Sequence, residues 1–184
     1  MRIELTVTTD IVTEPITLAE AKGYLRVDAT SEDDLITELI TAAREWAENY
    51  TGKAFGAKTY TVLFSELLSD EYRLNLPYPP HATITSVNAV DREGTKTLLV
   101  ENTDYYVSGA VKASIDIYGK NEAAYEVVYT TSADAMTANV KQAMLKVIAD
   151  MYENRQNEKE ESNTPIKYDT MAMLAGVRLN PFRL

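Results

Sequence analysis

Two long stretches of the chain repeat their apolar residues at the spacing of an α-helix. Between residues 32 and 51 the apolar side chains recur every three or four positions, at Leu35, Ile36, Leu39, Ile40, Ala43, Trp46, Ala47 and Tyr50. A second stretch follows the same template, with Val140, Ala143, Met144, Val147, Ile148, Met151 and Tyr152. This spacing places the apolar side chains on one side of a helix. The sequence therefore predicts two amphipathic helices, with Trp46 in the core that the first one forms.

Local signals indicate where the helices begin and end. Thr17 and Glu20 have the spacing of a capping box, which predicts a short helix from there to about Leu25. Ser31 precedes three consecutive acids and is expected to cap the helix of residues 32–51, because acids favour the positive end of a helix dipole. Gly52 follows the last apolar residue and is expected to end that helix.

Between residues 55 and 131 the apolar positions change to a period of two. β-branched and aromatic residues concentrate in segments typical of strands, at 58–64, 72–76, 83–90, 95–100, 105–107, 114–118 and 125–130. The polar segment 91–94, which ends in Gly94, is expected to close a hairpin. No helical stretch long enough for a crossover interrupts the series. We therefore expect a small antiparallel sheet that could curl towards a barrel.

The predicted fold is α+β, a small helical bundle with an inserted antiparallel β subdomain. Residues 1–54 and 132–184 together form the helical body, and residues 55–131 form the β-rich insertion. The stretch 154–163 is highly charged and contains no apolar residue, so we expect a helix end that passes into a mobile loop.

Charge and cysteine content exclude several classes of protein. The chain of 184 residues has no cysteine, which excludes disulfides and thiolate metal sites, and its formal net charge is -10. Lys and Arg form no basic stripe, so sequence-specific binding to nucleic acid is not expected. The first residues lack the pattern of a signal peptide, and no stretch approaches about 18 apolar residues. We expect a protein of a reducing cytoplasm that does not span a membrane.

The residues with catalytic or metal-binding potential have simpler explanations. His81 is the only histidine, has no cysteine or suitable serine near it in sequence, and is expected to be an exposed loop residue. Four oxygen-bearing residues alternate as ligands do in calcium loops: Asp28, Thr30, Glu32 and Asp34. Asp33 stands where such a loop needs glycine, which favours a capped helix start. Phosphate-loop, dinucleotide and nucleophile-elbow motifs are absent. We expect no enzyme, no cofactor and no metal.

A series of short segments between residues 15 and 54 carries a more specific signal: Pro15–Lys22, Leu25–Asp28, Asp33–Ile36, Ala42–Arg44 and Tyr50–Ala54. In order and spacing, this series resembles the opening of the head-tail connector (head completion) proteins of tailed bacteriophages. The helix that ends at Met151–Arg155 is similar to the family's last long helix. The β-rich middle matches only in outline, and resembles longer members with a strand-rich insertion.

This resemblance implies a structural virion protein of a tailed phage or prophage. It implies a homo-oligomeric ring that matches the portal symmetry, docks under the portal protein, extends the DNA channel and receives the next tail adaptor or tail terminator. DNA would pass through without specific contacts, and the acidic charge would suit a channel wall that repels phosphate. The expected location is the virion, assembled in the bacterial host cytoplasm. On the residues alone, two alternatives stay open: a small hydrolase with an unrecognised carboxylate pair, and a monomeric binding module or assembly chaperone.

The C-terminal segment 170–184 is apolar and follows the charged stretch. Such a segment either folds back on its own helical body or crosses to a neighbour. The flexible charged stretch before it and the adaptable methionines within it favour the second alternative. We therefore expect a loosely held assembly element that forms a subunit or portal interface through Met171, Leu174, Val177, Arg178, Leu179, Phe182 and Arg183.

Overall fold

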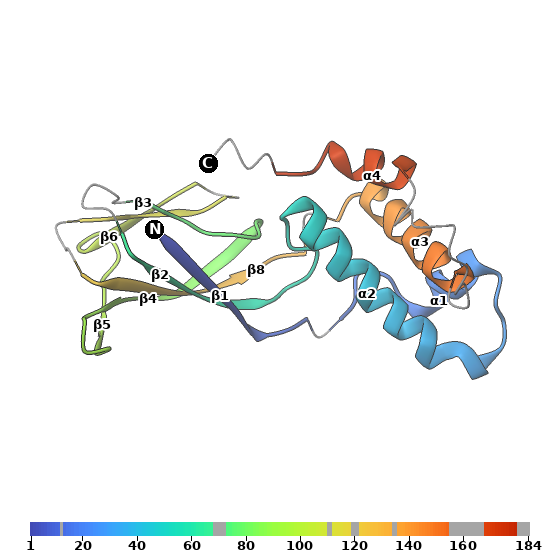
Figure 1. The fold of residues 1–184 in the computed structure, drawn as a ribbon, viewed down its shortest axis with the longest axis horizontal. Helices are drawn as coiled ribbons and strands as arrows, with labels where there is room; N and C mark the ends of the chain where they lie inside the picture. Colours follow the sequence, from blue (N-terminus) through green and yellow to red (C-terminus); the bar gives the residue numbers. More distant parts are fainter. Residues whose placement is uncertain are drawn as a thin grey trace. The chain divides into compact units, whose positions relative to one another are not determined.

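The chain forms two compact units (Figure 1). The computed structural model describes residues 1–11, 13–67, 73–109, 112–118, 122–133, 136–154 and 168–179. The first unit, called the β unit, comprises Met1–Val12 and Gly56–Ala133, and the second, called the helical unit, comprises Thr13–Phe55 and Asp134–Arg183. Antiparallel strands form the first unit and helices the second, which confirms the predicted α+β class.

The β unit contains two antiparallel sheets. The larger has the strand order β1-β2-β8-β4-β5, and its strands are β1 (Arg2–Thr9), β2 (Thr59–Ser65), β8 (Ala124–Thr131), β4 (His81–Val90) and β5 (Lys96–Leu98). The smaller has the order β3-β7-β6, with β3 (Arg73–Asn75), β7 (Ser114–Ile117) and β6 (Tyr105–Ser108). Seven of these strands match segments predicted from the period of two. The hairpin at 91–94 is confirmed, since β4 pairs with β5 and Gly94 has a φ of 84°.

One apolar core joins the two sheets of the β unit. Buried residues alternate along β2 and β8, so that one face of each strand points inward. Phe64 and Val127 come from the larger sheet, and Leu74 and Ile115 from the smaller, and all four are fully buried in the same cluster. The sheets therefore pack face to face, and neither has a complete core without the other.

The first strand differs from the expectation. Residues 1–12 were assigned to the helical body, but β1 pairs with β2 along its length, from Arg2 opposite Ser65 to Thr9 opposite Thr59. Apolar and polar residues do alternate from Arg2 to Thr9, which is a strand signal. The pairing with β2, whose residues lie at least fifty positions away in sequence, places this segment in the β unit.

In the part of the helical unit that the structure describes there are four α-helices, α1 (Leu18–Leu25), α2 (Asp33–Thr51), α3 (Ala138–Glu153) and α4 (Tyr168–Ala175). The capping box is confirmed, because the Thr17 side chain accepts from the Glu20 amide and the Glu20 side chain accepts from the Thr17 amide. The stop at Gly52 is also confirmed by its left-handed φ of 70°. Ser31 does not cap α2: it lies inside a 3-10 turn, Thr30–Glu32, that leads directly into the helix.

All four described helices share the core of the helical unit, and α1 contributes the fully buried Ala21. The fully buried residues include Ile36 on α2, Met144 and Ile148 on α3, and Leu174 on α4. Trp46 was expected in this core but is only half-buried, and its ring stacks on Tyr50 at 5.5 Å on the flank of the cluster. The buried side of α2 combines part of the predicted stripe with the adjacent row that contains Arg44: Ile36, Ile40, Ala43, Arg44, Ala47, Glu48 and Thr51.

The expected mobile loop at 154–163 falls almost wholly outside the described residues. Asn154 itself ends α3, where its amide donates to the Asp150 carbonyl at 3.0 Å. Among the helices that the structure describes, none has the length and apolar character needed to cross a membrane.

Candidate functional site

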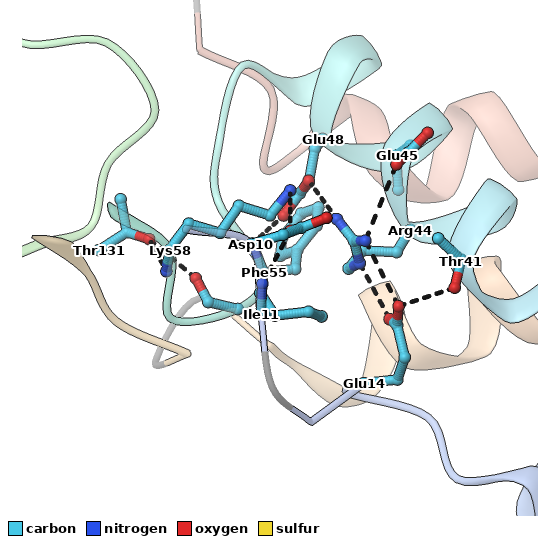
Figure 2. Close-up of polar contacts among 12 residues, drawn as sticks. Asp10, Ile11, Glu14, Thr41, Arg44, Glu45, Glu48, Phe55, Lys58 and Thr131 are labelled. Atoms are coloured by element: carbon cyan, nitrogen blue, oxygen red, sulfur yellow. Dashed lines mark hydrogen bonds and ion pairs between the residues drawn. The ribbon is translucent and has the colours of Figure 1, made fainter. Parts of the chain in front are cut away.

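The helical unit contains a buried cation. The Arg44 side chain on α2 is only 1% exposed, and its guanidinium contacts three carboxylates, of which the more exposed Glu45 is the most distant at 3.9 Å (Figure 2). Nε donates to Glu14 Oε2 at 2.9 Å, and Nη1 donates to Glu48 Oε2 at 3.0 Å. Glu48 is itself buried. Because removing charge from water is costly, a buried guanidinium persists only where acids pair with it and accept its hydrogen bonds.

This network holds both ends of the segment Thr13–Phe55. Glu14, near the start of the segment, also accepts a hydrogen bond from Thr41 Oγ1 at 2.9 Å. At the end of the segment, the amide of Phe55 donates to Glu48 Oε1 at 3.0 Å. One face of α2 therefore fixes the chain where it enters and where it leaves this part of the helical unit. The charged side chains of this network pair with one another, which is typical of a structural role.

The β unit fixes its own chain ends with a different set of contacts. Lys58 is buried, its Nζ lies 3.3 Å from Asp10 Oδ1, and its amide donates to Thr131 Oγ1 at 3.0 Å (Figure 2). The Thr131 hydroxyl in turn donates to the Gly56 carbonyl at 2.8 Å. A Cβ atom on Gly56 would lie 2.4 Å from Ile11 Cγ2. The close packing of Ile11 therefore requires glycine at this position.

His81 is not the exposed loop residue that the sequence suggested. It begins β4 and is 8% exposed. Its Nδ1 accepts from the Ala113 amide at 2.9 Å, so the proton of the neutral ring lies on Nε2, which donates to the Pro77 carbonyl at 2.8 Å. The His81 ring also packs edge-to-face with the Tyr129 ring, with 5.1 Å between the ring centroids. Both ring nitrogens hold the backbone in place, which is a structural role.

Open hollows with polar residues in their linings lie in both units, and the one in the β unit is lined by residues that include His81 and Glu101. In the helical unit, a hollow of about 280 Å³ is lined by residues that include Tyr24, Lys146 and Asp169. Lys146 Nζ lies 2.9 Å from Asp169 Oδ2, and this hydrogen bond lowers the pKa of Asp169 and raises the pKa of Lys146. Both groups are therefore charged at neutral pH, as in a surface ion pair. Within the described ranges, no group of three or more His, Cys, Asp or Glu could hold a metal ion.

The structure distributes the predicted interface residues unevenly. Leu174 is fully buried in the helical unit's own core, and the partly buried Val177 packs against that core. The Leu179 amide donates to the Thr51 carbonyl at 2.8 Å, and the exposed Arg178 guanidinium lies 5.0 Å from the Tyr50 ring centroid. Over residues 168–179 the segment thus folds back on its own unit, which is the first of the two alternatives and opposes a loosely held element there. Met171 is half-buried, and Phe182 and Arg183 lie outside the described residues.

The exposed large apolar residues were not expected from the sequence. Nine are exposed among the described residues, and eight of them belong to the β unit. Four form the set that we call the β1 patch: Met1, Ile3, Leu5 and Val7. The other four form the set that we call the β5 patch: Leu98 on β5, Val100 after it, Tyr106 on β6 and Tyr118 after β7. In the helical unit only Tyr24 is of this kind in the part of the chain that the structure describes.

Comparison with known proteins gives a family and a fold. A family model described as head completion protein matches residues 14–170. A chain in the neck of an empty gene transfer agent (GTA) particle, computed with C6 symmetry, has a TM-score of 0.76 and 20% identity over 96% of both chains. A chain in the virion of the native GTA particle has a TM-score of 0.75 and 20% identity over 96% of this chain and 95% of that chain. A chain in the neck of the native particle, computed with C12 symmetry, has a TM-score of 0.68 and 19% identity over 96% of both chains. No curated protein matches.

Proposed function

The chain belongs to the head completion protein family, structural virion proteins of the head-tail connector, and from this premise we propose that it forms a homo-oligomeric ring under the portal. In this role the ring extends the DNA channel and receives the next tail adaptor or tail terminator. The match over residues 14–170 carries the proposal, because it spans the first part of the helical unit, the insertion and the second part as far as the start of α4. Neither the hydrolase nor the chaperone alternative has comparable support.

The solved neck structures add support for a ring. Two similar chains belong to particle necks computed with sixfold and twelvefold symmetry, and each is covered along 96% of its length. A subunit in such a ring repeats one contact with each neighbour, so each copy needs two different complementary surfaces. We propose a ring with the symmetry of the portal.

The charge of the chain suits contact with passing DNA. The formal net charge is -10, and like charge on a channel wall repels the phosphate backbone. DNA would therefore move through the ring without specific binding. The subunit would assemble in the host cytoplasm and remain in the virion.

We also propose that the C-terminal segment contributes to the contact with the portal or the next subunit. The exposed Arg178 and the half-buried Met171, Val177 and Leu179 are the described members of the predicted set that such a partner could reach. Leu174 would support the segment from within the core. Arg178→Glu is expected to weaken attachment while the subunit stays folded. Its matched control is Lys53→Glu, which makes the same charge change on the same unit.

Native mass spectrometry and electron cryomicroscopy test the proposal. The purified full chain, alone and mixed with the portal protein, is expected to form a ring in at least the mixture, and virions are expected to contain that ring at the neck. A free monomer in both samples, together with virions that lack the chain at the neck, would contradict a connector function.

A further inference from the structure

The larger sheet of the β unit has an apolar edge that its own fold does not cover. β1 is the outermost strand of the sheet and pairs only with β2. Ile3, Leu5 and Val7 stand opposite Phe64, Val62 and Tyr60, so they share the face of the sheet that forms the core. The β2 residues are at most 2% exposed, whereas the β1 residues are 46%, 37% and 47% exposed.

The uneven size of the two sheets accounts for this exposure. The larger sheet has five strands and the smaller has three. The core of the β unit draws on β2, β4 and β8 from the larger sheet, but none of its members lies on β1. The edge strand therefore extends beyond the shared core. Edge strands are commonly protected by proline or by charged side chains on the inner face. β1 has no proline, and its charged residues Arg2 and Glu4 lie on the other face.

A second apolar surface lies beyond the opposite edge of the same sheet. β5 is the last strand in the order β1-β2-β8-β4-β5. Leu98 ends this strand, and Val100 begins the turn that follows; they are 65% and 58% exposed. The Asp104 carboxylate accepts from the Val100 amide at 2.9 Å, and the Asp104 carbonyl accepts from the Tyr118 amide at 2.8 Å. Tyr118, which is 52% exposed, therefore lies beside the same turn.

Both surfaces belong to one compact unit, so their separation is set by the sheet itself. We propose that the β1 patch of one copy packs against the β5 patch of the next copy, so that the edges of successive sheets form the contact between ring neighbours. This proposal rests on the ring function proposed above. Two different apolar patches at opposite edges meet the requirement of a head-to-tail contact, in which each copy presents one surface to each neighbour. Exposed apolar patches of this kind mark protein interaction sites.

Cysteine cross-linking tests the pairing directly, because the natural chain has no cysteine. Leu5→Cys and Val100→Cys are made singly and together in the full chain, and the assembled rings are oxidised. The double variant is expected to give a ladder of covalent oligomers. Each single variant is expected to stay monomeric on a denaturing gel, and a mixture of the two single variants is expected to give a covalent dimer. Dimers from Leu5→Cys alone would show that β1 pairs with itself and would overturn the proposal.

A charge substitution supplies an independent measurement. Leu5→Asp is expected to lower the fraction of subunits in rings by about tenfold or more, since the contact would have to bury an unpaired carboxylate. Thr6→Asp is the matched control, because Thr6 is the next residue on β1 and faces the other side of the sheet. Circular dichroism shows whether both variants are folded. Equal loss of rings in the two variants would contradict a contact through the inner face.

The outcomes separate this contact from the function on which it rests. If the unmodified chain forms rings but the double cysteine variant gives no ladder within them, the β1 and β5 patches do not pair, and the ring function stands. If the unmodified chain forms no ring with the portal or in virions, both proposals fail.

Discussion

The two units differ in how much of their apolar surface they cover. The helical unit buries a charged network, Arg44 with Glu14 and Glu48, and covers nearly all of its large apolar residues. The β unit has a core of aliphatic and aromatic side chains and leaves eight large apolar residues exposed at its surface. The difference suggests a division of roles: the helical unit relies on a buried charged anchor, and the β unit presents most of the described apolar surface that a partner could cover. The predictions below test this contrast from the largest expected effect to the smallest.

The strongest test of the helical unit is Arg44→Met. This change leaves Glu48 buried without its cation, so we expect a loss of about 3–5 kcal/mol in the free energy of unfolding. Chemical denaturation provides the measurement. The double variant Arg44→Met with Glu48→Gln is expected to recover part of the loss, because the buried charge is removed and the amide oxygen still accepts from the Phe55 amide. A single variant as stable as the natural chain would show that the network contributes little.

In the β unit, the largest effect is expected at Gly56. Gly56→Ala places a methyl group 2.4 Å from Ile11 Cγ2, and overpacking of this kind costs about 1–3 kcal/mol. Adding Ile11→Ala should restore part of the stability. Gly23→Ala on α1 is the control in the helical unit, where a Cβ atom meets nothing within 4 Å. We expect it to stabilise by about 0.5–1 kcal/mol, since alanine favours a helix. Equal effects at the two glycines would contradict the packing argument.

Trp46→Ala tests the rim of the helical core. A fully buried tryptophan would cost about 3–5 kcal/mol, but Trp46 is half-buried and stacks on Tyr50, so we expect about 2 kcal/mol. Urea unfolding followed by circular dichroism is the measurement, because the variant loses the only tryptophan fluorophore. A loss above about 4 kcal/mol would place Trp46 in the core after all.

Alkaline pH should weaken the β unit in particular. Burial raises the pKa of the Tyr129 phenol well above its ordinary value, and its hydroxyl donates to the Pro77 carbonyl at 2.7 Å. The folded state holds the phenol proton more tightly than the unfolded state. The contribution of Tyr129 to the free energy of unfolding is therefore complete below the unfolded-state pKa of about 10, and it declines as the pH rises above 10. The expected loss is about 1.4 kcal/mol for each pH unit above 10. In Tyr129→Phe, the free energy of unfolding should fall less steeply with rising pH, as measured by chemical denaturation at a series of alkaline pH values. The same slope in the variant and the natural chain would show that other groups cause the loss.

The local elements followed from the sequence because their causes are local. The Thr17 and Glu20 capping box, the end of α2 at Gly52 and the 91–94 hairpin all depend on residues a few positions apart. The apolar spacing along α3 predicted buried residues from Val140 to Ile148, because residues that recur at the helical period lie on one side of the helix. The family resemblance at residues 15–54 rested on the same local order, and the family match over 14–170 confirmed it.

Only the tertiary structure decided which side of each element is covered. On α2 the unit buries part of the apolar stripe together with Arg44, whose guanidinium pairs with Glu14 from outside the helix, and leaves Trp46 on the flank. His81 is buried because the Ala113 amide reaches its ring from a distant segment. β1 is an edge strand because β2 pairs with it and no strand of the smaller sheet covers it. Each of these outcomes depends on a contact between residues far apart in sequence, and a periodic pattern along the chain carries no information about such a partner.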